Sequence, residues 1–270
     1  YRSGLTRKGG PIAAFLFVGP TGVGKTELAK IITEIQFGDQ GLIQRFDMSE
    51  YQDKTSFFRF IGSPDGTVSG ALTDAVALKP YSLILLDEFE KAYPDILNLF
   101  LQVFDDGRLT DNLGKVVDFQ NTIIIATSNA HSEFIKSEIE RGVSIKDIAG
   151  QLKRKLTDYF KPELLNRFSD VIVFKPLSSE HIRAITEIAV RELAAVLRDN
   201  QGIELQWDQS LVDEIARLGY DSVFGARPLR KVISEKLRSA LAEKILKNEI
   251  SRGGKITATV ESGRFIFKNV

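Results

Sequence analysis

A glycine-rich stretch directly after an apolar run limits most strongly what this chain can fold into. Residues 13–18 read AAFLFV, residues 19–26 read GPTGVGKT, and TELAKIITEI continues from there with helical periodicity. The pattern G-x-x-x-x-G-K-[ST] thus lies between a predicted strand and a predicted helix. Glycines let backbone N–H groups wrap phosphate oxygens, and the positive end of the following helix adds attraction. A chance glycine turn is a much weaker explanation in this setting.

Each position of this loop has an expected role in binding a nucleotide. Lys25 is predicted to reach the β- and γ-phosphates, and the Thr26 hydroxyl is predicted to bind Mg²⁺. ATP or ADP with Mg²⁺ is therefore the predicted cofactor. The predicted nucleotide-binding residues are Gly19, Pro20, Thr21, Gly22, Val23, Gly24, Lys25 and Thr26.

Two further apolar runs end in polar residues suited to hydrolysis. LILLDE ends in Asp87 and Glu88, and TIIIATSN ends in Asn129. The carboxyl ends of parallel strands meet at one sheet edge, which would place these groups beside the phosphate loop. Asp87 is then expected to hold Mg²⁺, Glu88 to polarise the attacking water, and Asn129 to orient that water. A pair of unrelated surface acids is the weaker interpretation, so we expect nucleotide hydrolysis rather than binding alone.

The wider pattern of apolar runs predicts an α/β fold in two parts. Short apolar runs, most of them nearly continuous, occupy residues 13–18, 42–46, 83–86, 122–127 and 171–174, as expected for strands of a parallel sheet buried on both faces. Helical patterns lie between them, one beginning at Pro94 and another covering 148–160. Beyond Pro176 the chain is mainly helical, with helices from Ser179 and over about 228–246, and it closes with alternating segments at 255–261 and 264–269. We therefore predict domains at 1–176 and 177–270.

Composition excludes several classes of function. Lys plus Arg and Asp plus Glu both total 36, so net charge gives no reason to expect nucleic acid or a membrane surface as partner. There is no cysteine, which excludes disulfides and thiol catalysis. The two histidines, His131 and His181, are too isolated for a zinc site and are expected to be surface or cap residues. We expect a cytoplasmic protein and, since Tyr1 replaces an initiating Met, a piece of a longer chain.

Several longer motifs together resemble one family. They are GPTGVGKTELAK, FDMSEY, LLDEFEKAYPD, FLQVFDDGRLTD, TSN, PELLNRF and GYDSVFGARPLR. Over essentially its whole length, the chain is similar to the second ATPase module of Clp-type AAA+ unfoldases, the ClpA, ClpB and ClpC group. The resemblance implies a five-stranded phosphate-loop domain, a small mainly helical domain with a short sheet, and a hexameric ring with ATP at each subunit interface. It also implies that Asn129 is sensor 1, Arg167 an arginine finger acting on the neighbour's ATP, and Arg227 sensor 2.

The chain departs from the family pattern in the stretch FIGSPDGTVSGALTDAV, residues 60–76. The family has a longer loop there, with a Tyr flanked by Gly and Val that grips a polypeptide. Here Thr67 and Val68 stand in that place, so they are the candidate substrate-loop residues. Natural divergence, deliberate shortening or residues missing from the loop would each account for this, and we favour divergence. A second predicted substrate loop, 105–119, has the family pattern.

Two other family features are missing. A VGQ-type segment that helps to hold the adenine does not precede the first strand, and TSN is not followed by the hydrophobic–Gly–hydrophobic tripeptide of unfoldases that dock on the ClpP peptidase. We therefore do not expect ClpP docking. The leading hypothesis is an ATPase module that remodels polypeptides, within a ring in the full-length protein, while the isolated module is a monomer or a filament. The alternatives are a nucleotide-gated assembly module that does not thread substrate and, less favoured, a nucleic-acid motor.

Overall fold

The computed structural model describes residues 9–111, 114–221 and 224–269. These residues form two compact units. The first comprises residues up to Pro20 and Gly24–Lys175, and the second comprises Thr21–Val23 and Pro176–Val270. The central residues of the predicted second substrate loop, 112–113, lie outside the described residues.

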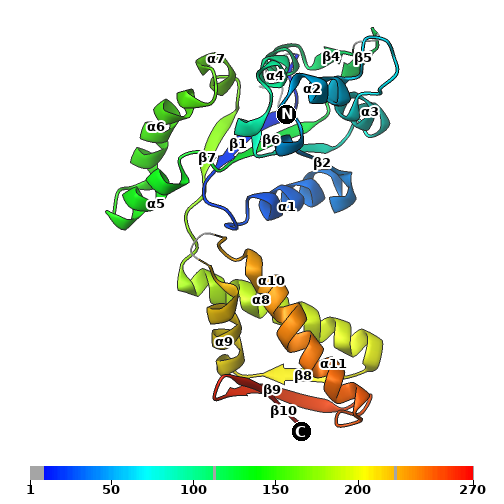
Figure 1. Cartoon of the computed structure of the whole chain (residues 1–270), viewed down its shortest axis with the longest axis vertical. Coiled ribbons are helices and arrows are strands. Elements are labelled where there is room, and N and C mark those ends of the chain that lie inside the picture. The colour runs from blue at the N-terminus through cyan, green and yellow to red at the C-terminus, as the bar shows by residue number, and fades with distance from the viewer. Residues whose placement is uncertain (1–8, 112–113, 222–223, 270) are drawn as a thin grey trace. The chain divides into compact units, whose positions relative to one another are not determined.

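The first unit is built on a five-stranded parallel sheet (Figure 1). Its strands are β1 (Ala13–Val18), β2 (Ile43–Asp47), β3 (Leu83–Asp87), β6 (Ile123–Ser128) and β7 (Asp170–Val173), in the order β2-β3-β6-β1-β7. All neighbouring pairs run parallel. The predicted five-stranded α/β sheet is therefore confirmed, with strand limits that differ from the expected ones by at most one residue.

The two faces of this sheet carry different helices, because side chains alternate along each strand. On β1, Leu16 and Val18 join the core packed against α2 (Lys54–Ile61), α3 (Ala71–Leu78) and α4 (Pro94–Asp106). Phe17 points to the other face, where it packs with Ala29 of α1 (Lys25–Phe37). Burial on both faces explains why most of the strands read as nearly continuous apolar runs.

The remaining elements of the first unit include a hairpin that the apolar pattern did not predict. Its strands, β4 (Arg108–Thr110) and β5 (Val116–Asp118), are antiparallel and too short to leave an alternating signal. The helix expected over 148–160 is replaced by α6 (Ile145–Lys155) and a 3₁₀ turn, Leu156–Asp158. This unit also contains α5 (Ser132–Glu140), α7 (Pro162–Leu165) and short 3₁₀ helices at Gln40–Leu42, Met48–Glu50 and Phe89–Lys91.

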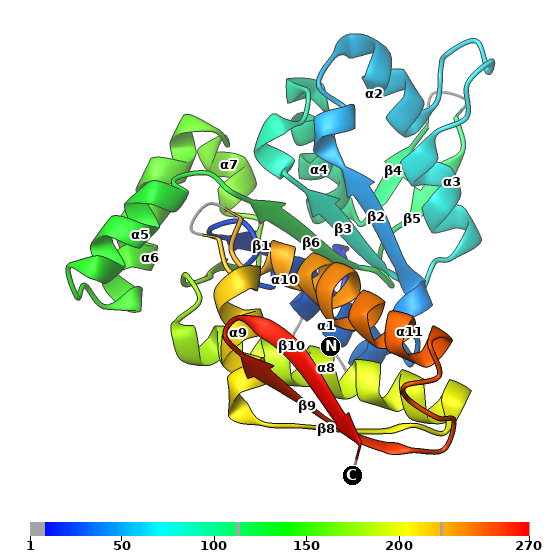
Figure 2. The same ribbon diagram turned by 60° about the horizontal axis from the view of Figure 1, so that its bottom comes forward.

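The second unit combines helices with a small sheet in the order β10-β9-β8 (Figure 2). The strands are β8 (Glu204–Trp207), β9 (Lys255–Glu261) and β10 (Arg264–Asn269), and the helices are α8 (Ser179–Gln201), α9 (Gln209–Gly219), α10 (Arg227–Val232) and α11 (Ser239–Leu246). A π-helical segment, Ile233–Arg238, joins α10 to α11. The mainly helical unit with a short sheet is thus confirmed, whereas β8 and α9 were not predicted.

Both histidines serve as helix-start residues. His131 precedes α5, and the His181 ring accepts from the Ser178 backbone N–H at 3.3 Å in a reciprocal cap of α8. No helix within the described part of the chain combines the length and apolarity needed to span a membrane.

Candidate active site

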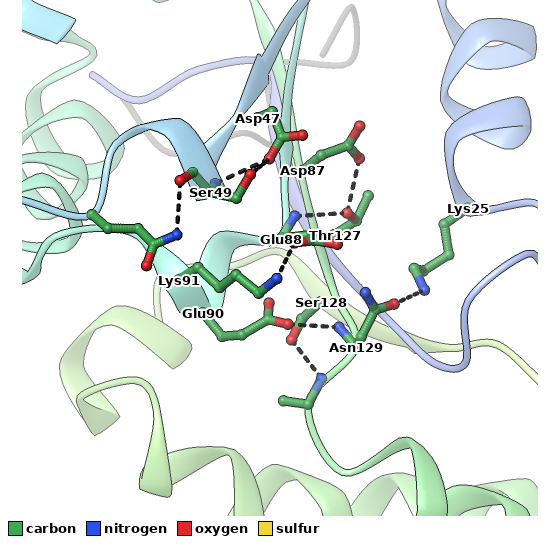
Figure 3. A network of polar contacts seen from close by, with 12 residues as sticks. Lys25, Asp47, Ser49, Asp87, Glu88, Glu90, Lys91, Thr127, Ser128 and Asn129 are labelled. Carbon is green, nitrogen blue, oxygen red and sulfur yellow. Dashed lines mark hydrogen bonds and ion pairs between the residues drawn. The ribbon is translucent and has the colours of Figure 1, made fainter. Parts of the chain in front are cut away.

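The predicted polar residues gather where three neighbouring strands end. Lys25 begins α1 after the loop that follows β1, Asp87 is the last residue of β3, and Asn129 directly follows β6. Because β3, β6 and β1 are adjacent and parallel, their carboxyl ends bring these side chains to one sheet edge, as Figure 3 shows. The structure therefore brings together Lys25, Asp87, Glu88 and Asn129.

Lys25 is held by oxygen atoms on three sides. Its Nζ donates to the carbonyl oxygens of Gly19 at 2.6 Å and Pro20 at 2.8 Å, and to Asn129 Oδ1 at 2.7 Å. The residue is only 8 % exposed, so these oxygens compensate for the burial of its ammonium charge. Gly24, the residue before the helix, has φ 99°, a conformation that favours glycine. The loop therefore presents its cation where phosphate oxygens could replace the present acceptors.

Asp87 is buried and accepts a hydrogen bond on each oxygen. Thr127 Oγ1 donates to Oδ1 at 2.9 Å, and Arg45 Nε donates to Oδ2 at 2.5 Å. The carboxylate is thereby oriented at the strand end. Oxygen donors are what Mg²⁺ prefers, and the carboxylate of Asp87 with the hydroxyl of Thr26, in the first turn of α1, fits that preference.

Glu88 follows with an unusual backbone conformation. Its φ is 54°, in the left-handed region that non-glycine residues seldom adopt, and its N–H donates to Thr127 Oγ1 at 3.3 Å. The Glu88 side chain forms an ion pair with Lys91, one 3₁₀ turn later, in which Lys91 Nζ donates a hydrogen bond to Glu88 Oε2. This hydrogen bond raises the pKa of Lys91. The strand end is thus turned sharply, which separates the Glu88 side chain from that of Asp87 (Figure 3).

Asn129 is connected to the acidic segment through its backbone. Its N–H donates to Glu90 Oε1 at 3.1 Å, while its side chain accepts from Lys25. Glu90 Oε2 is buried and has no hydrogen-bond partner among the described residues. The phosphate loop, the end of β6 and the segment after β3 are therefore linked by one chain of polar contacts.

Sequence reasoning missed four residues of this cluster: Arg45, Thr127, Glu90 and Lys91. Thr127 lies two residues before Asn129, and Glu90 and Lys91 follow the predicted acids within LLDEFEK, so nearness in sequence was an available signal. Arg45 carried none, since its partner Asp87 lies on the neighbouring strand.

The two predicted arginines do not belong to this cluster of contacts. Arg167 lies between α7 and β7 and forms an ion pair with Asp105, with Nη2 and Oδ2 2.7 Å apart. Arg227 is the exposed first residue of α10, in the second unit. Their expected roles therefore stay predictions.

The predicted substrate-loop residues lie in a closed polar turn. The Ser63 N–H donates to the Val68 carbonyl at 2.8 Å, and the Val68 N–H donates to Ser63 Oγ at 2.9 Å. Inside this ring, Thr67 Oγ1 donates to Asp65 Oδ1 at 2.8 Å, and Ser63 Oγ donates to the same oxygen. Hydrogen bonds from Ser63 and then Thr67 lower the pKa of Asp65 to about 2. Val68, which is 40 % exposed, is a large apolar residue at this turn.

Comparison with known families agrees with this fold. Residues 10–171 match the AAA domain (Cdc48 subfamily), so the chain belongs to the AAA family of ATPases. Residues 177–258 match the C-terminal, D2-small domain of ClpB protein.

Individual relatives support the same assignment over nearly the whole chain. The chaperone protein ClpB of Meiothermus ruber is 47 % identical over 93 % of this chain, and that of Rhodopirellula baltica is 43 % identical over 98 %. The ClpB of Clostridium tetani is 43 % identical over 100 % of the chain. The chain spans only 30–31 % of the length of these relatives.

Proposed function

We propose that this module uses Mg²⁺-dependent ATP hydrolysis to remodel polypeptides, as part of a cytoplasmic ClpB-like chaperone. The observation that carries the proposal is the convergence of Lys25, Asp87, Glu88 and Asn129 at one sheet edge. We assign residues 1–176 to the nucleotide-binding domain and 177–270 to the small domain. The printed name of the relatives, chaperone protein ClpB, favours polypeptides as substrates.

The residues at the edge divide the chemistry between them. Lys25 exchanges its carbonyl acceptors for phosphate oxygens, with the backbone of residues 19–24 around them. Asp87 and Thr26 hold Mg²⁺, which neutralises charge on the phosphates when it is bound. Glu88 accepts a proton from, or orients, the attacking water, and Asn129 fixes that water through its amide. The ion pair with Lys91 must open or turn for Glu88 to reach the water.

Completion of the site requires a second copy of the chain. Arg167 is proposed to supply positive charge to the ATP of a neighbouring subunit, and Arg227 to contact the γ-phosphate as sensor 2. Head-to-tail contacts of this kind close into a ring when the rotation from one subunit to the next divides a full turn. We propose that the full-length protein forms a hexamer. Without a neighbour, the transition-state charge is incompletely countered and turnover is slow.

The substitution Glu88→Gln tests the hydrolytic assignment. It keeps the size of the side chain and removes the proton acceptor, so we expect turnover by the assembled protein to fall at least about 100-fold while ATP binding persists. Glu133→Gln, at an exposed residue of α5, is the matched control and should leave turnover unchanged. Undiminished turnover in Glu88→Gln would contradict the assignment.

A second candidate function is a nucleotide-gated assembly module that does not thread substrate. The closed turn Ser63–Val68 favours it, because the side chains of Ser63, Asp65 and Thr67 bond to one another and the turn carries no aromatic ring. ATP-driven unfolding of a tagged model protein separates the two functions. Vigorous unfolding would exclude the non-threading module, whereas ATP turnover without unfolding would support it. The absence of a ClpP-docking tripeptide favours, for either function, action without that peptidase.

A further inference from the structure

Arg167 is held by one acidic residue from a distant part of the first unit. Its Nε donates to both carboxylate oxygens of Asp105 at 2.8 Å, and Nη2 lies 2.7 Å from Oδ2. Nη1 donates to the Glu163 carbonyl at 2.8 Å. Such a two-atom contact fixes the plane of the guanidinium as well as its position.

Arg167 has donors beyond those that these contacts use. A guanidinium carries five N–H groups, and the contacts above use the one on Nε and one on each terminal nitrogen. One N–H on Nη1 and one on Nη2 therefore have no hydrogen bond among the described residues. The side chain is 28 % exposed, and the terminal nitrogens of a guanidinium can bind two phosphate oxygens.

Asp105 is itself placed firmly. It belongs to the last turn of α4, where the Gly107 N–H donates to the Val103 carbonyl at 3.0 Å. The Gly107 carbonyl accepts from the Phe119 N–H at 2.7 Å, which closes the base of the β4–β5 hairpin. Beside the ion pair, the rings of Phe104 and Phe168 pack edge to face with centroids 5.1 Å apart. Adjacent residues on both segments therefore fix the spacing between Asp105 and Arg167.

We propose that Asp105 is a positioning residue, which holds Arg167 by its Nε edge so that the two terminal N–H groups face the phosphoryl group in a neighbouring copy of this chain. The inference rests on the proposed function, in which Arg167 acts in trans. The partly exposed ion pair contributes little to stability, so the arrangement is explained better by orientation than by folding. The hydrogen bonds that Arg167 donates to Asp105 also raise the pKa of the guanidinium.

Steady-state ATP turnover by the assembled protein tests the proposal. In Asp105→Asn one carboxylate oxygen is replaced and the charge is lost, so we expect kcat to fall roughly 10- to 100-fold with KM for ATP unchanged. Asp95→Asn removes the same charge from an exposed residue in the first turn of α4, outside the predicted substrate loop, and should leave kcat unchanged. Asp105→Asn in an Arg167→Ala background should cause no further loss. Equal effects at 105 and 95, or full additivity with Arg167→Ala, would overturn the proposal.

Mixed assemblies separate a role in trans from general damage. Asp105→Asn subunits keep their own Lys25, Asp87 and Glu88, whereas Glu88→Gln subunits keep a correctly held Arg167. Mixing the two should therefore restore turnover above the sum of the separate proteins, and no restoration would overturn the proposal. If Arg167→Ala itself leaves turnover unchanged, the proposed trans role of Arg167 fails. If Arg167→Ala lowers turnover but Asp105→Asn does not, only the role of Asp105 fails.

Discussion

The sheet edge and the turn Ser63–Val68 use polar side chains in opposite ways. At the edge, contacts join residues far apart in sequence: Lys25 reaches Asn129, 104 residues away, and Arg45 reaches Asp87, 42 residues away. In the turn, Ser63, Asp65, Thr67 and Val68 bond to one another across five residues or fewer. The edge therefore depends on the whole sheet, whereas the turn is built from its own residues.

This difference indicates where the module can change without losing its fold. A substitution at the edge breaks a contact between two strands and affects both the packing and the chemistry. A substitution in the turn alters a mostly exposed segment in which the hydrogen bonds among Ser63, Asp65, Thr67 and Val68 join near neighbours in sequence. The sequence of the turn can therefore diverge at little cost in folding stability while the residues of the sheet edge are kept. Three predictions test this difference between the edge and the turn.

The largest effect is expected for Thr127→Val, which removes a hydrogen bond between two strands at the sheet edge. The change removes the donor to Asp87 Oδ1 from a side chain that is only 4 % exposed. We expect the free energy of unfolding to fall by about 1–3 kcal/mol, because a buried carboxylate oxygen loses its partner. Turnover should fall roughly tenfold, because the carboxylate that we propose to hold Mg²⁺ loses a hydrogen bond that orients it.

Thr122→Val is the matched control at the other end of the same strand. Thr122 is also buried, and its hydroxyl donates to the Phe119 carbonyl at 2.8 Å, away from the carboxyl edge. Denaturant unfolding should show a comparable loss of stability there, with turnover unchanged. Equal turnover losses in both variants would mean that Thr127 acts only through folding.

Much of the fold and the core of the site followed from sequence for one reason: buried parallel strands are marked by apolar runs, and their last residues face the edge. Asp87, Glu88 and Asn129 each stand at such an end, so strand limits sufficed to place them, and Lys25 was marked by the glycine-rich pattern after β1. The other contacts of the site could be predicted only with knowledge of which strands are neighbours in the sheet. That Arg45 lies beside Asp87 depends on β2 pairing with β3, which no local pattern gives.

The loops were harder to predict because their geometry comes from side-chain hydrogen bonds. The missing aromatic residue at Thr67 was visible in sequence, but the ring of bonds around Asp65 was not. Likewise PELLNRF marked Arg167, whereas its partner Asp105 is 62 residues away and within a motif predicted to contact substrate. The identity of a residue could thus be predicted, while its partner depended on tertiary structure.

A smaller effect is expected for Thr67→Tyr, which tests whether the turn faces substrate. An aromatic ring is large and rigid enough to press against varied side chains. If the turn lines a substrate channel, ATP-driven unfolding of a tagged model protein should increase roughly two- to fivefold with turnover unchanged. Thr67→Val also removes the hydroxyl without adding a ring, so it controls for opening the turn. Equal unfolding by both variants would place the turn outside the substrate path.

The smallest effect concerns the charge inside the turn. The pKa of Asp65 is lowered from 3.8 to about 2 by hydrogen bonds from Ser63 and Thr67. Because the folded value lies below the ordinary one, the contribution of these bonds is complete above pH 3.8 and is lost as the pH falls through about 2. Carbon NMR of the Asp65 carboxyl should therefore show little titration between about pH 5 and about pH 3.

Thr67→Val should move this midpoint part of the way back toward 3.8, because the Ser63 hydrogen bond remains. The melting temperature above pH 3.8 should fall only slightly, since the carboxylate is exposed and keeps its hydrogen bond from Ser63. A wild-type midpoint near 3.8 would mean that the turn is open in solution. An open turn would leave Val68 and its neighbours free to contact substrate. The turn would then differ from the sheet edge in being mobile, and not in having lost its function.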